Sequence, residues 1–433
     1  MLVPACLFLL SSSLVPLAAC GEDPQEEVSS DASTNASSSS GGSSGGSSGS
    51  AEAGAPRCHE QPPAADAPHF LVTAHPYSEE TDSDGGVLAT RATTFKVHAI
   101  DDDGARYVAD FELGGYASFG QVAFTPDGRI GAVALDSREE NARGTVGIFQ
   151  LDERGTPKVV QALYKGDFFA SQVAFSPDGR YLYIADTNTA KNGGGVYVAA
   201  IDCEGKPGAA VRAISGSGST VPMWLGTAAP YRALVATTDL LGDDDNQPVE
   251  LFEVNGPTMT RTSGADPFGD KALISQFATT VDGRFTLMTT HNELFGPARV
   301  YAVKLDEDGA PASGGAFDRP GAEGIVVSPF ANAVFVTSAD PNGAYTMTHD
   351  PANTTEPFGA PKEIAYGADG RPELPAYAGV VRRGPLKGRI VITENTTIRQ
   401  LQFEADGRVT DRGSVAIEGT HSQNEIGAAG LTP

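Results

Sequence analysis

Residues 172–186 carry the sequence QVAFSPDGRYLYIAD, and this stretch decides the fold. On both sides of its Pro-Asp-Gly triplet, apolar residues recur with the period of two that is typical of half-buried β-strands. Proline presets the φ angle that begins a tight turn, and glycine adopts the positive φ that such a turn needs. The stretch therefore predicts two antiparallel strands joined by a tight turn.

The same pattern recurs along the chain. Residues 121–136 (QVAFTPDGRIGAVALD) and 276–291 (QFATTVDGRFTLMTTH) are clear copies, and weaker copies begin near residues 229, 327 and 388. The arginine that follows the turn recurs about every fifty residues, with one double step, at Arg129, Arg180, Arg232, Arg284 and Arg389. Self-similarity at a fixed period indicates a repeat architecture.

Each repeat is long enough for four strands. In the unit that contains residues 172–186, two further strands are predicted at 196–202 (VYVAAID) and 210–214 (AVRAI). Four antiparallel strands in a period of about fifty residues are typical of a β-propeller blade. A helical repeat is excluded, because no window keeps an apolar period of about 3.6 residues.

Six repeats are complete and a seventh is divided between the chain ends. Residues 69–75 (HFLVTAH) match a second strand, and residues 426–433 (IGAAGLTP) match a first strand. We therefore predict an all-β fold, a seven-bladed β-propeller in which the C-terminal strand closes blade 1 and removes an exposed sheet edge.

The repeat also resembles a known family. The pattern of residues 172–186 is similar to that of the YVTN/lactonase-like seven-bladed β-propellers, and the resemblance extends from His69 to the end of the chain. It implies the propeller fold. It also implies one of several activities, because the family includes lactone hydrolases as well as periplasmic and surface binding proteins.

The first residues of the chain predict where the protein is located in the cell. Residues 1–19 form a short apolar run that fits a signal peptide, and the run ends in Leu17-Ala18-Ala19-Cys20. This resembles the bacterial lipoprotein box, which implies lipidation of Cys20; the alternative is an ordinary secretory cleavage site with an incidental cysteine. We expect a lipid-anchored protein of the cell envelope, at the outer membrane or the periplasmic face.

Three regions follow from this reading. Residues 1–19 are the predicted lipoprotein signal peptide, and residues 20–57 are a predicted disordered tether, acidic at first and then rich in Ser and Gly. Residues 58–433 are the predicted propeller. The chain has 30 Lys and Arg against 55 Asp and Glu, a net charge of −25. This disfavours nucleic acid as a partner, and we expect a monomer whose partners are the membrane and a protein or small-molecule ligand.

The candidate binding residues lie at one mouth of the central channel. Loops after second strands and before first strands gather on one face, and acidic residues occur in these loops. The predicted mouth residues are Asp136, Asp186, Asp239, Asp340 and Glu394. Carboxylates that converge are suited to Ca²⁺, which takes 6–8 oxygen ligands; the alternative is that each one caps a turn. Gln121, Gln172 and Gln276 begin inner strands and are predicted to point near the channel.

The catalytic candidates belong to the same loops. His75, His291 and His421 could meet across the mouth as metal ligands or as a general base, and Glu293 could pair with His291. The alternative is that the three imidazoles are unrelated surface groups, because no ligand spacing links them. No cofactor other than a possible Ca²⁺ is predicted.

Two cysteines remain after Cys6 and Cys20 are assigned to the signal peptide and the anchor. Cys58 and Cys203 are both predicted on the face opposite the mouth, and outside the cytoplasm such a pair is expected to form a disulfide. The sequence thus favours an envelope-anchored propeller that acts as a non-enzymatic binding or scaffold module. The alternative is a lactonase-like hydrolase, metal-assisted or not.

Overall fold

In a computed structural model, the described residues all lie within one compact unit, Ala53–Pro433. The described residues are 56–81, 87–117, 120–136, 144–187, 194–216, 220–236, 249–267, 274–290, 299–318, 322–339, 341–350, 352–353, 356–417 and 426–433.

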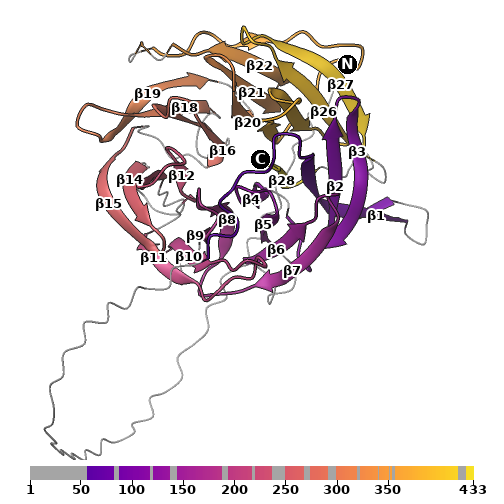
Figure 1. Cartoon of the computed structure of the whole chain (residues 1–433). Helices are drawn as coiled ribbons and strands as arrows, with labels where there is room; N and C mark the ends of the chain where they lie inside the picture. Colours follow the sequence, from indigo (N-terminus) through magenta and orange to yellow (C-terminus); the bar gives the residue numbers. More distant parts are fainter. Residues whose placement is uncertain are drawn as a thin grey trace, which may run out of the picture. The chain divides into compact units, whose positions relative to one another are not determined.

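Within these residues, seven four-stranded antiparallel sheets form a ring (Figure 1). Blade 1 contains, from the channel outward, β28 (Ala429–Leu431), β1 (His69–Thr81), β2 (Val87–Asp101) and β3 (Gly104–Glu112). Blade 2 contains β4 (Ala123–Phe124), β5 (Ile130–Leu135), β6 (Thr145–Leu151) and β7 (Pro157–Tyr164). Blade 3 contains β8 (Ala170–Phe175), β9 (Tyr181–Asp186), β10 (Gly195–Ala200) and β11 (Val211–Ser215). The predicted all-β, seven-bladed fold is confirmed.

The other four blades follow in chain order. Blade 4 contains β12 (Met223–Trp224), β13 (Tyr231–Ala236), β14 (Val249–Asn255) and β15 (Thr258–Ala265). Blade 5 contains β16 (Ile274–Thr279), β17 (Phe285–Thr290), β18 (Arg299–Leu305) and β19 (Pro311–Asp318). Blade 6 contains β20 (Ala322–Val327), β21 (Ala333–Ala339), β22 (Asn342–Thr348) and β23 (Lys362–Glu363). Blade 7 contains β24 (Ala378–Val380), β25 (Arg389–Thr393), β26 (Thr397–Phe403) and β27 (Val409–Ala416).

The repeated turn is formed by its own side chains. In blade 3 the N–H of Ser176 donates to the carbonyl of Tyr181, and Gly179 has a φ of 67°. The Ser176 hydroxyl donates to Asp178 at 2.5 Å, and the same carboxylate oxygen accepts the N–H of Arg180 at 3.2 Å. Each Pro-Asp-Gly motif is therefore a local signal that sets the register of two strands.

The ring is closed by the last residues of the chain. β28 pairs with β1 through Leu431 and Leu71, which confirms the prediction that the C-terminal strand completes blade 1. Thr432 holds the junction twice, because its N–H donates to the Phe70 carbonyl at 2.8 Å and its hydroxyl accepts the Phe70 N–H at 2.9 Å. On the other side, the N–H of Val122 donates to Ala429 at 2.9 Å, so β28 joins blade 1 to blade 2.

Apolar side chains fill the interfaces between blades. Seven clusters of buried residues are present in the described part of the chain, and each one joins two neighbouring blades, including the interface of blade 7 with blade 1. The core is thus distributed around the ring, and every blade depends on both neighbours.

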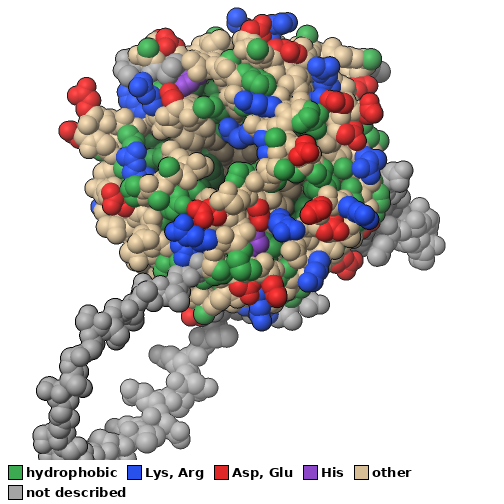
Figure 2. Space-filling view, viewed as in Figure 1, with side chains coloured by type: hydrophobic (Ala, Val, Ile, Leu, Met, Phe, Trp, Pro, Cys, Tyr) green, Lys and Arg blue, Asp and Glu red, His purple; other side chains and the backbone are tan. Residues whose placement is uncertain are grey.

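Residues 56–68 cross one face of the ring before β1 begins (Figure 1). At one end His59 contacts the turns of blades 2 and 3, and at the other end Arg383 of blade 7 donates to the Ala64 carbonyl at 2.7 Å. Figure 2 shows this face in space-filling form, with a hollow near its centre and Lys and Arg side chains beside the hollow. None of the described residues forms a helix with the length and hydropathy needed to cross a membrane.

Candidate functional site

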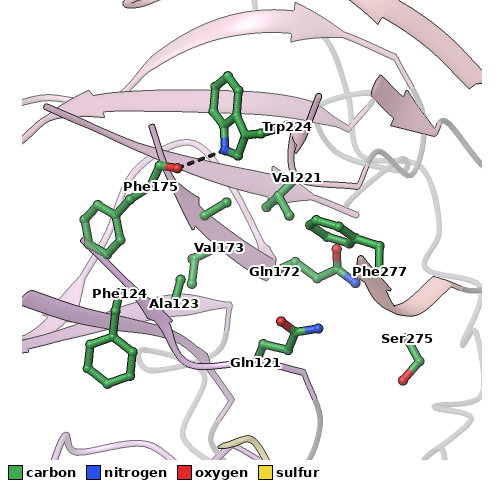
Figure 3. Close-up of a pocket in the computed structure, with 11 residues that line it drawn as sticks. Gln121, Ala123, Phe124, Gln172, Val173, Phe175, Val221, Trp224, Ser275 and Phe277 are labelled. Atoms are coloured by element: carbon green, nitrogen blue, oxygen red, sulfur yellow. Dashed lines mark hydrogen bonds between the residues drawn. The ribbon is translucent and has the colours of Figure 1, made fainter. Parts of the chain in front are cut away.

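A cavity of about 200 Å³ lies between the inner strands of blades 2 to 5 (Figure 3). It is lined by Gln121, Ala123, Phe124, Gln172, Val173, Ala174, Phe175, Val221, Trp224, Ser275 and Phe277. None of these side chains is charged. Ligand sites are concave, largely apolar and equipped with a few polar groups, and this cavity has that character at a size below the typical ~300–1,000 Å³.

Aromatic rings form much of the wall. Trp224 is fixed in place by two contacts. Its indole N–H donates to the Phe175 carbonyl at 2.9 Å, and its ring packs edge-on against the ring of Tyr183, with the ring centroids 5.3 Å apart. Phe124 and Phe175 occupy the same motif position in blades 2 and 3, whereas Phe277 of blade 5 occupies the position of Val173. The repeats of blades 2 and 3 therefore supply a phenylalanine at the same place in the wall.

Gln172 is one of three polar residues in the wall of the cavity, with Gln121 and Ser275. Its amide nitrogen donates to the Ile274 carbonyl at 3.0 Å and so links blade 3 to blade 5. Its amide oxygen is buried and has no hydrogen-bond partner among the described residues. A buried acceptor in this state is uncommon in native proteins and calls for an explanation.

Ser275 and Glu323 form a pair at the wall. The Ser275 hydroxyl donates to Glu323 Oε2 at 3.0 Å, and the Glu323 backbone carbonyl accepts the Thr289 hydroxyl at 2.6 Å. Both Ser275 and Glu323 are half-buried, so the carboxylate is held beside the cavity while water retains access to it. A carboxylate in this position can accept a proton from water or from the serine hydroxyl.

The predicted mouth carboxylates have separate environments. Asp136 is exposed, and its backbone bridges to Tyr116. Asp186 is fully buried and accepts the N–H of Phe169 at 3.0 Å. Asp239 and Asp340 lie outside the described residues.

Glu394 is engaged in a buried ion-pair cluster within blade 7. It pairs with Arg399 and accepts the Thr397 hydroxyl at 2.5 Å, and Arg399 also pairs with Asp411 at 2.8 Å. This arrangement neutralises the carboxylate inside the blade. Across the described residues no three His, Cys, Asp or Glu side chains converge as metal ligands do, and the Ca²⁺ site stays a prediction.

His75 lies inside blade 1. Its side chain is buried, its Nε2 is 2.9 Å from the Thr73 hydroxyl, and His98 Nε2 lies 3.5 Å from the same hydroxyl. Burial lowers the pKa of His75 to about 3, with a smaller contribution from the charge of Lys96. The other catalytic candidates, His291, Glu293 and His421, and the lipidation residue Cys20 lie outside the described residues, so their roles stay predictions.

Cys58 and Cys203 are joined by a disulfide, the pairing that the sequence predicts, with their Cα atoms 5.2 Å apart. The bond attaches the first described residues to the turn between β10 and β11 of blade 3. It is a structural feature that fastens the start of the propeller to the ring.

Sequence reasoning missed part of the cavity. Of the three glutamines predicted to point near the channel, Gln121 and Gln172 line this cavity and Gln276 does not. Ser275 was not predicted as a cavity residue. The signal that could have identified it is its position directly before Gln276, at the start of an inner strand. Trp224 is the only tryptophan of the chain and its environment depends on blades 3 and 4 together, so no local pattern identifies it as a cavity residue.

Comparisons with known proteins agree on the fold. No family model matches the chain, and no curated protein matches it. Among solved structures, a periplasmic gluconolactonase from Pseudomonas aeruginosa is 16% identical with a TM-score of 0.56, over 84% of this chain and 99% of that one. A proposed 6-phosphogluconolactonase from Bacteroides fragilis is 15% identical with a TM-score of 0.57, over 86% of this chain and 100% of that one. A Lactobacillus plantarum protein is 13% identical with a TM-score of 0.58, over 84% and 100%.

At these identities the likeness is one of fold. The chain is a seven-bladed β-propeller, and the fold that the sequence resemblance implies is confirmed.

Proposed function

We propose that the chain hydrolyses a small cyclic ester in the cavity between blades 2 and 5. The observation that carries this proposal is the hydrogen bond of 3.0 Å between the Ser275 hydroxyl and Glu323 Oε2 at the cavity wall. The names of two structural neighbours, a gluconolactonase and a proposed 6-phosphogluconolactonase, support a lactone as the substrate class.

In this proposal Glu323 is the general base. The carboxylate removes a proton from a water molecule, directly or through the Ser275 hydroxyl, while the water oxygen attacks the ester carbonyl carbon. The bond between the carbonyl carbon and the ring oxygen then breaks, and the ring oxygen takes up the proton. The product is an open-chain hydroxy acid, and the apolar wall around Trp224 holds the ring of the substrate.

The test is lactone hydrolysis by the purified full chain, followed by acid release and corrected for the spontaneous rate. Glu323→Gln should lower the rate by about 10²–10⁴-fold, which is the usual contribution of a general base. Ser275→Ala should have a smaller effect, because water can still reach the carboxylate. The matched control is Glu363→Gln in the outer strand β23, where Glu363 pairs with Arg371 at 2.8 Å. A wild-type chain without acceleration of any lactone, or Glu323→Gln with full activity, would contradict the proposal.

A second candidate, ligand binding without catalysis, is favoured by the lining of the cavity. The wall has no charged side chain and most of its residues are apolar. Saturable binding of a ring compound that remains intact in prolonged incubation would support this function and would exclude the hydrolase.

For the location we propose an envelope lipoprotein, anchored through Cys20, with residues 20–57 as the tether. Support comes from the sequence Leu17-Ala18-Ala19-Cys20 after an apolar run. The test is metabolic labelling of the expressed chain with a radioactive fatty acid. Label that is absent from Cys20→Ala but present in Cys6→Ala supports the anchor, and equal labelling of both variants contradicts it.

A further inference from the structure

We infer that Gln172 is the recognition residue of the cavity, and that its amide oxygen accepts a hydrogen bond from a hydroxyl of a neutral, hydroxylated ring ligand. The inference deepens the proposed function. It depends on that function only for the claim that the ligand is an ester, because the recognition of its hydroxyls is argued from the cavity alone. Its basis is a comparison between two glutamines that occupy the same place in their repeats.

Gln276 in blade 5 is the structural counterpart of Gln172 in blade 3. Its amide nitrogen donates to the Ala378 carbonyl in blade 7 at 2.6 Å. Its amide oxygen accepts two backbone N–H groups, from Ile325 in blade 6 at 3.1 Å and from Ala378 at 3.3 Å. Both the nitrogen and the oxygen of the Gln276 amide therefore have protein partners, and Gln276 acts as a brace between blades 5, 6 and 7.

Within the described part of the chain, Gln172 makes the hydrogen bond of the amide nitrogen but not those of the amide oxygen. Its amide nitrogen also reaches across one blade, to the Ile274 carbonyl in blade 5. Its amide oxygen is buried without a protein donor among the described residues, and Gln172 lines the cavity whereas Gln276 does not. The two glutamines thus differ in one respect: backbone N–H groups of the described residues donate to the amide oxygen of Gln276 but not to that of Gln172.

Pro222 explains why one of these two donors, the counterpart of the Ile325 N–H, is missing at Gln172. In blade 6, Ile325 lies three residues before Ser328. The N–H of Ser328 donates to the carbonyl of Ala333, the first residue of the second strand of that blade. Pro222 lies three residues before Leu225, whose N–H donates to the Arg232 carbonyl, within the first two residues of the second strand of blade 4. Pro222 therefore stands where Ile325 supplies its N–H, and proline has no N–H to supply.

The cavity accordingly offers acceptors and needs a ligand with donors. Gln172 provides its amide oxygen, and the Ser275 oxygen can accept because its own hydrogen is donated to Glu323. The indole N–H of Trp224 is already used by Phe175. A hydroxylated ring meets these requirements, since its hydroxyls donate and its carbon face packs on the aromatic wall.

The charge of the ligand follows from the same wall. None of the eleven lining residues is charged, so a phosphate or carboxylate on the ligand would lose its hydration without a compensating partner. We therefore expect a neutral ring rather than a phosphorylated one, and the small volume of about 200 Å³ limits the ligand to about one ring.

Trp224 is the only tryptophan of the chain, and its fluorescence reports occupancy of the cavity directly. The probe is 1,5-anhydroglucitol, a neutral hydroxylated six-membered ring without an ester. Tetrahydropyran is the same ring without hydroxyls, and 1,5-anhydroglucitol 6-phosphate is the charged analogue. Each compound is titrated against the full chain and against four variants: Gln172→Leu, Pro222→Ala, and the controls Gln161→Leu and Pro157→Ala in the outer strand β7.

We expect a saturable change with anhydroglucitol and clearly weaker binding of both analogues. Gln172→Leu should weaken binding about five- to thirtyfold, the effect expected for one lost acceptor. Pro222→Ala should weaken it to a similar extent without a loss of stability, because the new N–H would occupy the Gln172 oxygen. Both controls should bind as the wild type does.

Several results would overturn the inference: no saturable change with anhydroglucitol, wild-type affinity in Gln172→Leu or Pro222→Ala, or tighter binding of the phosphate. These outcomes are separate from a failure of the proposed function, because the probe has no ester and the measurement requires no turnover. A chain that binds anhydroglucitol through Gln172 but hydrolyses no lactone keeps this inference and loses the hydrolase.

Discussion

His59 Nδ1 lies 2.8 Å from a carboxylate oxygen of Asp127, 68 residues further along the chain. The other ring nitrogen of His59 lies 3.2 Å from the Asp202 carbonyl. One buried imidazole therefore connects residues 56–68 to the turn of blade 2 and to blade 3. The hydrogen bond to Asp127 outweighs burial and raises the pKa of His59 above its usual value of 6.5.

This pair predicts a loss of stability on the alkaline side. Because the folded-state pKa of His59 is raised, its contribution is complete below pH 6.5 and is lost as the pH rises through the raised value. Asp127→Asn should remove the pH dependence and cost about 1.5–3 kcal/mol at pH 6, the usual range for a hydrogen bond to a charged group. Urea unfolding from pH 5 to pH 9 measures both effects. An unchanged slope in Asp127→Asn would contradict the assignment.

The disulfide should stabilise the same junction more strongly. Cys58 and Cys203 are 145 residues apart, and a loop of this length corresponds to about 4–5 kcal/mol in the chain-entropy model. The double variant Cys58→Ala, Cys203→Ala should therefore unfold at a much lower urea concentration than the wild type. Wild-type protein unfolded in the presence of a reductant is the control and should match the variant. Equal midpoints with and without reductant would show that the bond contributes nothing.

The architecture could be predicted because its signals are local. Asp178 accepts hydrogen bonds from its own turn, and Gly179 adopts the positive φ of that turn, so each Pro-Asp-Gly motif reports its structure within a few residues. Repetition of this signal then determines the number of blades. The closing strand could be predicted because residues 426–433 still carry the alternation of a first strand.

The candidate site could be predicted only in part, because its chemistry depends on residues that are distant in sequence. Glu394 looks like a free mouth carboxylate until Arg399 and Asp411 are brought to it by the pairing of β25, β26 and β27. Gln172 was correctly placed near the channel, but the state of its oxygen is determined by Pro222 in the next blade. No window around either residue contains this information.

Closure of the ring predicts a strong dependence on the last residues. Deletion of residues 425–433 should prevent soluble folding, because blade 1 would lose β28 and the interface with blade 2 would lose its backbone link. The point variant Gly430→Val tests the same contact, since a Cβ on Gly430 would lie 2.0 Å from the Val122 carbonyl oxygen. We expect little soluble protein from either change. The control Gly226→Ala alters an exposed loop glycine whose backbone is outside the left-handed region and where a Cβ meets no atom within 4 Å. A deleted chain with the wild-type melting temperature would refute closure.

Blade 1 should also make the protein sensitive to acid. Burial lowers the pKa of His75 to about 3 and that of His98 to about 4, and the charge of Lys96 lowers both further. Unfolding exposes both imidazoles and restores a pKa near 6.5, so between about pH 4 and pH 6.5 the unfolded chain binds more protons and stability falls as the pH falls. Each histidine adds up to about 1.4 kcal/mol per pH unit in this interval.

The measurement is the free energy of unfolding between pH 7 and pH 4, in the wild type and in the double variant that combines His75→Gln with His98→Gln. Both substitutions remove a titrating group from a site held by Thr73, so the double variant should be less stable at pH 7 but should lose stability less steeply on acidification. Asp110 lies beside His98 and opposes its shift, so Asp110→Asn should steepen the wild-type slope slightly. A double variant with the full wild-type slope would place the acid-sensitive groups elsewhere in the ring, and the neutral, buried state assigned to His75 and His98 would be wrong.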